Sequence, residues 1–265
     1  MLLFLLACTF GPGHGFGELE PVLFSAVLEP GPARDLGNGE ILTRQGYAVK
    51  LDHFVVGLGS LELLELQGAS GDATFDPADP PPGYGLCHGG HCHADDGSLV
   101  SYADIQAELA GGNAAFVPLV SLEAPSTVDL VAGSSATLSP DDPVLPAASL
   151  SLLQLHSSSL SLSGQVRREP ADEFSSSFQV DLPLTDGFSA GIELELARGE
   201  DPVLNLAVAL SPDGTLFDEL DFAALSTEGA WTVDSVDAPG ADALLAAVGS
   251  VEPTLSLERS SWSQK

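Results

Sequence analysis

Apolar and polar residues alternate along several stretches of this chain, and this period of two residues constrains its fold more than any other feature. Between 46 and 66, one side of the pattern carries Tyr47, Val49, Leu51, His53 and Val55. Lys50 and Asp52 stand on the other side. Because successive side chains of a strand point to opposite faces, this stretch is expected to form a half-buried strand with His53 on the core side.

The same alternation recurs further along the chain. One parity is shared by Leu150, Leu152, His156, Leu160 and Leu162, then by Phe178, Val180, Leu182 and Leu184, and again by Ile192, Leu194 and Leu196. Further strands are expected at 203–210 and around 255–257, and short helices near 102–110, 216–225 and 241–248. Many short strands separated by turns predict a mainly β fold, a single antiparallel β-sandwich or barrel-like domain over 18–265 with a few short helices.

A change in composition interrupts these strands at residues 68–98. This stretch is rich in Gly, Pro, Asp, His and Cys, and Asp79-Pro80-Pro81-Pro82-Gly83 stands in its middle. We expect it to be a long loop, and long ordered loops in compact domains are commonly functional. Ser101 is placed to cap the helix that follows, with Asp104 in its first turn, so the loop runs into a fixed element.

Two of the three cysteines and three of the six histidines fall within seven residues of this loop, Cys87 to His93. Imidazole and thiolate favour zinc, copper, nickel and iron over calcium or magnesium. Gly89-Gly90 allows a tight turn that brings the flanking side chains together. The segment therefore predicts a site for copper or zinc, with candidate ligands Cys87, His88, His91, Cys92, His93 and the nearby Asp95.

The start of the chain resembles an export signal. Leu5-Leu6-Ala7-Cys8 follows an apolar run and is similar to the lipobox of bacterial lipoproteins. The resemblance implies that Cys8 is acylated, that residues 1–7 are signal peptide, and that the protein is lipid-anchored in the cell envelope, on the periplasmic or outer-membrane side. The usual positive charges are absent, so the signal is expected to be incomplete. Residues 8–17, rich in Gly and framing His14, are expected to be a flexible tether.

Export bears on the other two cysteines. With Cys8 assigned to lipid, Cys87 and Cys92 are left as a pair in an oxidising compartment, where they are expected to form a disulfide. The ligands would then be His88, His91 and His93 with a nearby carboxylate. His53 and His14 are the remote candidates for a further ligand, although a histidine on an apolar strand face is also typical of a hydrogen-bonded core residue.

Cys87 to His93 also contains Cys-x4-Cys-His, which resembles a long variant of the haem-attachment motif of some multihaem cytochromes. That resemblance implies thioether bonds from Cys87 and Cys92 and an iron ligand in His93. The chain has no methionine beyond Met1, and the predicted strands differ from small helical cytochromes. We therefore expect a metal ion at this site, with haem c as a lesser alternative.

The charge balance narrows the classes of partner. The chain has 38 acidic and 8 basic residues, a net charge of −30, which repels nucleic acid and anionic lipid headgroups. The same charge concentrates cations, and it also suits a protein in saline surroundings. Membrane contact is expected through the lipid anchor alone.

No Gly-x-Ser-x-Gly, Walker or His-Glu-x-x-His motif appears, so catalysis is not the expected role. We expect an envelope lipoprotein that binds copper or zinc for buffering, delivery or sensing. The alternative is a structural or partner-binding surface lipoprotein whose disulfide only staples a loop.

Overall fold

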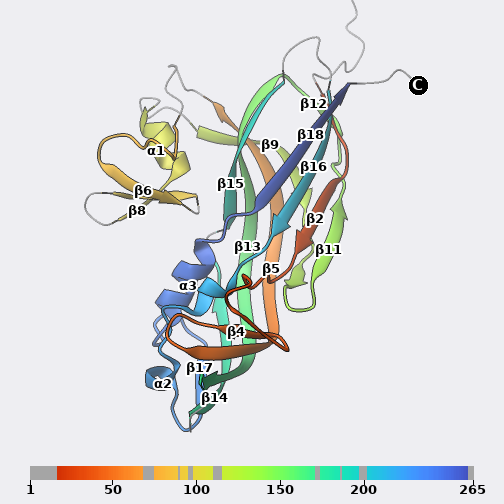
Figure 1. Cartoon of the computed structure of the whole chain (residues 1–265). Helices are drawn as coiled ribbons and strands as arrows, with labels where there is room; N and C mark the ends of the chain where they lie inside the picture. The colour runs from red at the N-terminus through yellow and green to blue at the C-terminus, as the bar shows by residue number, and fades with distance from the viewer. Residues whose placement is uncertain are drawn as a thin grey trace, which may run out of the picture.

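Two strands of 21 residues each, β5 (Tyr47–Gln67) and β13 (Ala148–Arg168), run antiparallel and form the spine of the molecule (Figure 1). This computed structural model describes residues 17–67, 75–88, 90–94, 98–109, 115–170, 174–185, 187–196 and 202–261. The edge of β13 away from β5 pairs with β15 (Phe188–Leu196) over residues 148–155 and with β14 (Ser175–Pro183) over residues 159–167. The other edge of β5 pairs with β9 (Ala115–Glu123), β10 (Thr127–Asp129) and β4 (Glu40–Leu42). At the two outer edges of this sheet lie β17 (Ala230–Val233) and β3 (Asp35–Gly37).

A second sheet is built around β16 (Pro202–Leu210). One edge of β16 pairs antiparallel with β18 (Thr254–Ser261). Along its other edge lie β1 (Gly17–Leu19) and β2 (Val22–Ala26), which follow each other and run parallel to β16. Outside them, β12 (Val144–Leu145) pairs with β1 and β11 (Ser134–Leu138) with β2. The predicted mainly β architecture is confirmed. Most described strand pairs are antiparallel, but β1–β16, β2–β16 and β14–β17 are parallel.

The inward-facing residues of the two sheets meet in one hydrophobic core. It includes Phe24 on β2, Phe54 on β5 and Leu206 on β16, all almost fully buried. The long spine sheet curls around this core, as Figure 1 shows. The expected alternation on β14 and β15 is confirmed, because buried and more exposed side chains alternate along both. The strand expected at 203–210 is β16, along which burial also alternates.

β-Bulges change the parity on the two long strands and correct the placement of two histidines. Opposite β13, His53 faces Ser163 and Leu51 faces Gly164, so Asp52 is the extra residue of a bulge. Beyond it the core side passes to Phe54, and the His53 side chain is 66% exposed, with Nδ1 3.6 Å from Oδ2 of Asp129. The expectation that His53 faces the core was wrong, because one inserted residue moves every later side chain to the other face.

His156 on β13 is displaced from the core side in the same way. Register shifts on either side of it leave Leu153 and Leu155 buried, and His156 points outward. Its Nε2 lies 3.1 Å from Oε2 of Glu62 on β5.

Short helical segments and aromatic rings close one end of the body. These segments are η1 (Gly214–Phe217), α2 (Phe222–Leu225) and α3 (Ala241–Gly249), at the positions expected from the sequence. The fully buried ring of Phe222 lies 5.5 Å from that of Tyr47, 5.6 Å from Trp231 and 5.8 Å from Phe178, measured between ring centroids. These rings make this end a continuous part of the core.

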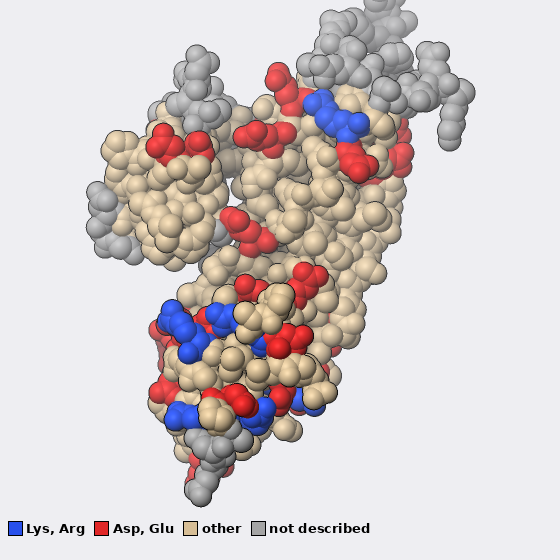
Figure 2. Space-filling view, viewed as in Figure 1, with Lys and Arg blue, Asp and Glu red and all other residues tan. Residues whose placement is uncertain are grey.

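Basic residues gather at the same end, interleaved with acidic ones (Figure 2). Arg34 donates to both carboxylate oxygens of Asp218, at 2.5 and 2.7 Å, and the backbone N–H of Arg44 also donates to Asp218. Arg167 bonds both oxygens of Glu40, which lowers the pKa of that carboxyl group. Several of the few basic side chains are therefore paired with carboxylates. None of the described helices combines the length and the apolar character needed to cross a membrane.

Candidate metal centre

The segment expected to be one long loop is partly a small folded lobe beside the body (Figure 1). It contains β6 (Tyr84–His88), β7 (His91–Ala94), β8 (Leu99–Ser101) and α1 (Tyr102–Leu109). The three strands form an antiparallel sheet in the order β6-β7-β8. The loop prediction was wrong for β6 and β7, because the residues on either side of the two glycines pair as strands of one sheet. The helix expected near 102–110 is confirmed as α1.

Gly89 and Gly90 connect β6 to β7, since His88 and His91 pair directly across from each other. Gly90 has a φ of +78°, which favours glycine, and a Cβ there would lie 2.2 Å from Oγ of Ser189 on β15. Its N–H donates to the carboxylate of Glu252 at 3.3 Å. The hairpin therefore ends against the body. The sequence signal that could have revealed the hairpin was the Gly-Gly pair between the residues of β6 and those of β7.

One face of the small sheet packs against α1. Cys92 and Ile105 are fully buried, and the Tyr84 hydroxyl donates to the Glu108 carboxylate on α1. That hydrogen bond raises the pKa of Tyr84. Burial raises the pKa of Tyr102, at the start of α1. The predicted cap is confirmed, because the backbone N–H of Asp104 donates to Oγ of Ser101 at 3.1 Å.

A disulfide joins Cys87 to Cys92 across β6 and β7, as expected for the paired cysteines. The two residues stand directly opposite each other, with their Cα atoms 4.0 Å apart. Because the sulfurs are bonded to each other, neither is available as a thiolate ligand or for a thioether bond to haem. The disulfide form therefore leaves the histidines as the candidate ligands of this segment.

The histidines project from the other face of the sheet. His91 and His93 are two residues apart on β7 and share a face, and His88 pairs with His91 from β6. Their ring centroids are 4.8 to 5.6 Å apart. Nε2 of His88 lies 3.2 Å from Nε2 of His93, and one nitrogen from each of the three rings lies within 4.8 Å of the others. His88 is exposed and the other two are half-buried.

This spacing fits a metal ion. Zn–N bonds of about 2.1 Å in a tetrahedral site place two ligand nitrogens about 3.4 Å apart. The His88–His93 separation of 3.2 Å is close to that value, and a nitrogen of His91 lies within 4.8 Å of the other two. Binding through one ring nitrogen requires the neutral imidazole with its proton on the other nitrogen. Among the described residues, these three form the one group of His, Cys, Asp or Glu side chains close enough to share an ion.

Of the remaining predicted ligands, His53 is the one that the structure describes, and it is not brought to this cluster. His53 lies on β5 of the body, beside Asp129. Asp95, His14 and Cys8 lie outside the described residues, as do the expected signal peptide and most of the tether. Glu252, which contacts the hairpin from the body, was not predicted, and no local pattern around it distinguishes it from the other acidic residues.

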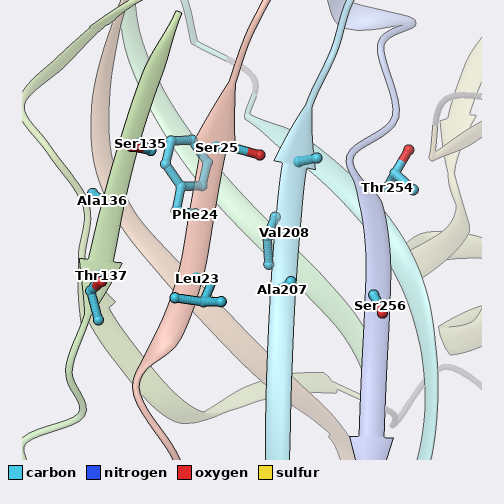
Figure 3. Close-up of a pocket in the computed structure, with 11 residues that line it drawn as sticks. Leu23, Phe24, Ser25, Ser135, Ala136, Thr137, Ala207, Val208, Thr254 and Ser256 are labelled. Carbon is cyan, nitrogen blue, oxygen red and sulfur yellow. The ribbon is translucent and has the colours of Figure 1, made fainter.

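A shallow groove of about 520 Å³ lies on the outer face of the second sheet (Figure 3). The residues around it are Leu23, Phe24, Ser25, Ser135, Ala136, Thr137, Ala207, Val208, Ala209, Thr254 and Ser256. Phe24 and Val208 are buried in the core, so the exposed lining is mostly small apolar and hydroxyl side chains together with Leu23. The groove contains no histidine, cysteine or carboxylate, so its lining offers neither strong metal ligands nor an acid–base pair. The face of the small sheet that carries His88, His91 and His93, called the histidine face below, is the better candidate site.

No protein-family model, curated protein or solved structure matches this chain. The geometry of His88, His91 and His93 is therefore the basis for assigning a function.

Proposed function

We propose that this protein binds a transition metal ion, copper or zinc, through His88, His91 and His93. The observation that carries the proposal is the convergence of three imidazole nitrogens within 4.8 Å on one face of a disulfide-linked hairpin. Copper and zinc are among the metals that imidazole ligands bind well. The acidic surface supports the same role, because a net charge of −30 raises the local concentration of cations.

We propose buffering or delivery of the ion as the role of the site. The described residues supply three ligands, whereas a closed structural zinc site has four. Asp95 is the candidate for the fourth position, and water or a ligand from a metal-exchanging partner could take it instead. The exposure of His88 leaves the ion reachable from solvent, which suits exchange.

Protein purified from its native compartment is expected to carry about one copper or zinc ion per chain. Elemental analysis of the purified protein measures this directly, and titration of metal-free protein against a chromophoric chelator gives the affinity for each metal. Protein that is metal-free as isolated and binds neither ion in the titration would contradict the proposal.

We also propose that the protein is exported and anchored in the cell envelope through Cys8. The resemblance of residues 5–8 to a lipobox supports this, and the Cys87–Cys92 disulfide suits an oxidising compartment. Cys8→Ser is expected to move the protein from the membrane to the soluble envelope fraction, because the acylated thiol would be lost. Fractionation and immunoblotting measure the shift; Cys87→Ser, which keeps Cys8, should stay with the membrane. An unchanged membrane fraction for Cys8→Ser would exclude this anchor.

The second candidate function is recognition of a partner protein by the lobe, with the disulfide as a staple only. It is favoured by two exposed leucines near the histidines, Leu86 on β6 and Leu99 on β8, which are 70% and 57% exposed. Leu99 stands directly opposite His93. The elemental analysis separates the two functions, because a lobe with this role alone would bind no ion stoichiometrically.

A further inference from the structure

The disulfide occupies the position in the lobe that most directly controls the spacing of the histidines. Cys87 and Cys92 form the cross-strand pair next to His88 and His91. His88 lies on β6, whereas His91 and His93 lie on β7. The covalent bond therefore fixes the distance between the strand that carries one candidate ligand and the strand that carries the other two.

The two sulfurs cannot reach the metal ion from where they stand. Side chains alternate along a strand, so Cys92 points away from the face on which its neighbours His91 and His93 stand. Cys92 is fully buried, whereas His91 and His93 are half-buried. Breaking the disulfide would consequently remove a restraint from the site without adding a thiolate ligand to it.

Apart from the disulfide, the hairpin is supported by pairing with β8, by the hydrogen bond from Tyr84 to α1 and by the contact of Gly90 with the body. The strands have three to five residues. The two fully buried apolar residues of the lobe, Cys92 on β7 and Ile105 on α1, lie outside the main hydrophobic core. A short hairpin is marginally stable in water without further packing or a covalent link. A bond that closes a short loop restricts the open conformations of that loop.

We propose that the redox state of the Cys87–Cys92 bond regulates metal binding: the oxidised lobe holds the ion, and reduction by thiols releases it. This regulation rests on the proposed function of the histidine face. A thiolate attacks the sulfur of Cys87, which is half-buried, and Cys92 leaves as the thiol after taking up a proton. A second thiol then displaces Cys87, so two thiols become one disulfide and the protein gains two electrons and two protons.

The test compares the zinc affinity of the oxidised and reduced protein. The Cys8→Ser variant is the parent, so that Cys87 and Cys92 are the only cysteines. One sample is reduced with a dithiol and desalted without oxygen, a second is left oxidised, and Cys87→Ser/Cys92→Ser provides a form that cannot be oxidised. The Kd for zinc is measured by chelator competition, and thermal unfolding of the body is followed in parallel.

Both the reduced sample and the double-serine variant are expected to bind zinc about tenfold or more weakly than the oxidised protein. The main unfolding transition should be unchanged, and reoxidation of the reduced sample should restore the original Kd. Equal affinity in the two redox states would overturn the regulation, as would tighter binding on reduction, which would indicate thiolate ligands. If the oxidised protein itself binds no zinc or copper, the proposed function fails and this inference fails with it.

Discussion

The variant His88→Ala/His91→Ala/His93→Ala is expected to lose stoichiometric binding of zinc and copper while the β body stays folded. Among the described residues, the three imidazoles form the group whose ligand atoms are close enough to share an ion. Removing them leaves only the weak, non-specific attraction of metal ions to the acidic surface. The body should be unaffected, because these side chains are absent from the main hydrophobic core. Calorimetric titration with each metal, together with circular dichroism, measures both outcomes.

The matched control is His53→Ala/His156→Ala, which removes two histidines that stand on the body. Each of them lies beside a carboxylate, Asp129 or Glu62, and neither belongs to the cluster. The control is expected to bind metal as the parent does. If the triple variant binds as tightly as the parent, the central proposal is wrong. Loss of metal in the control would instead indicate that His53 or His156 is a ligand.

Phe222→Ala is expected to lower the free energy of unfolding by about 3–5 kcal/mol, because it opens a cavity within a cluster of aromatic rings. The Phe222 side chain is fully buried, and its ring contacts those of Tyr47, Trp231 and Phe178. Urea denaturation followed by tryptophan fluorescence reports this change well, since Trp231 is one of the neighbouring rings.

Leu23→Ala provides the comparison for Phe222→Ala. Leu23 is 59% exposed on the outer face of the second sheet, so its truncation should change the stability by less than about 0.5 kcal/mol. Metal affinity should be the same in both variants, because neither residue lies in the lobe. A small effect of Phe222→Ala would show that this end of the body does not pack as described.

The predicted strands were found where the alternation is uninterrupted. Along β14 every second residue is buried, and the same holds for β15, so a period of two was enough to place Phe178 and Ile192 in the core. Along the long strands β5 and β13, the same alternation did not predict correctly which side chains face the core. A bulge depends on how two distant strands pair, and Asp52 carries no local mark of being the inserted residue of β5. His53 and His156 were misplaced for that reason.

For the candidate site, too, some features were predictable from the sequence and others were not. The density of histidine and cysteine in residues 87–93, the Gly-Gly turn and the pairing of two cysteines are local features, and the amino-acid sequence alone determined that His88, His91 and His93 would be neighbours. Only the tertiary structure decided that the segment is a hairpin beneath α1, with imidazoles on one face and the disulfide on the other. The physical reason is that ligand chemistry depends on residue type and short spacing. The face on which each side chain stands depends instead on strand pairing, and on contacts from residues as distant as Ser189 and Glu252.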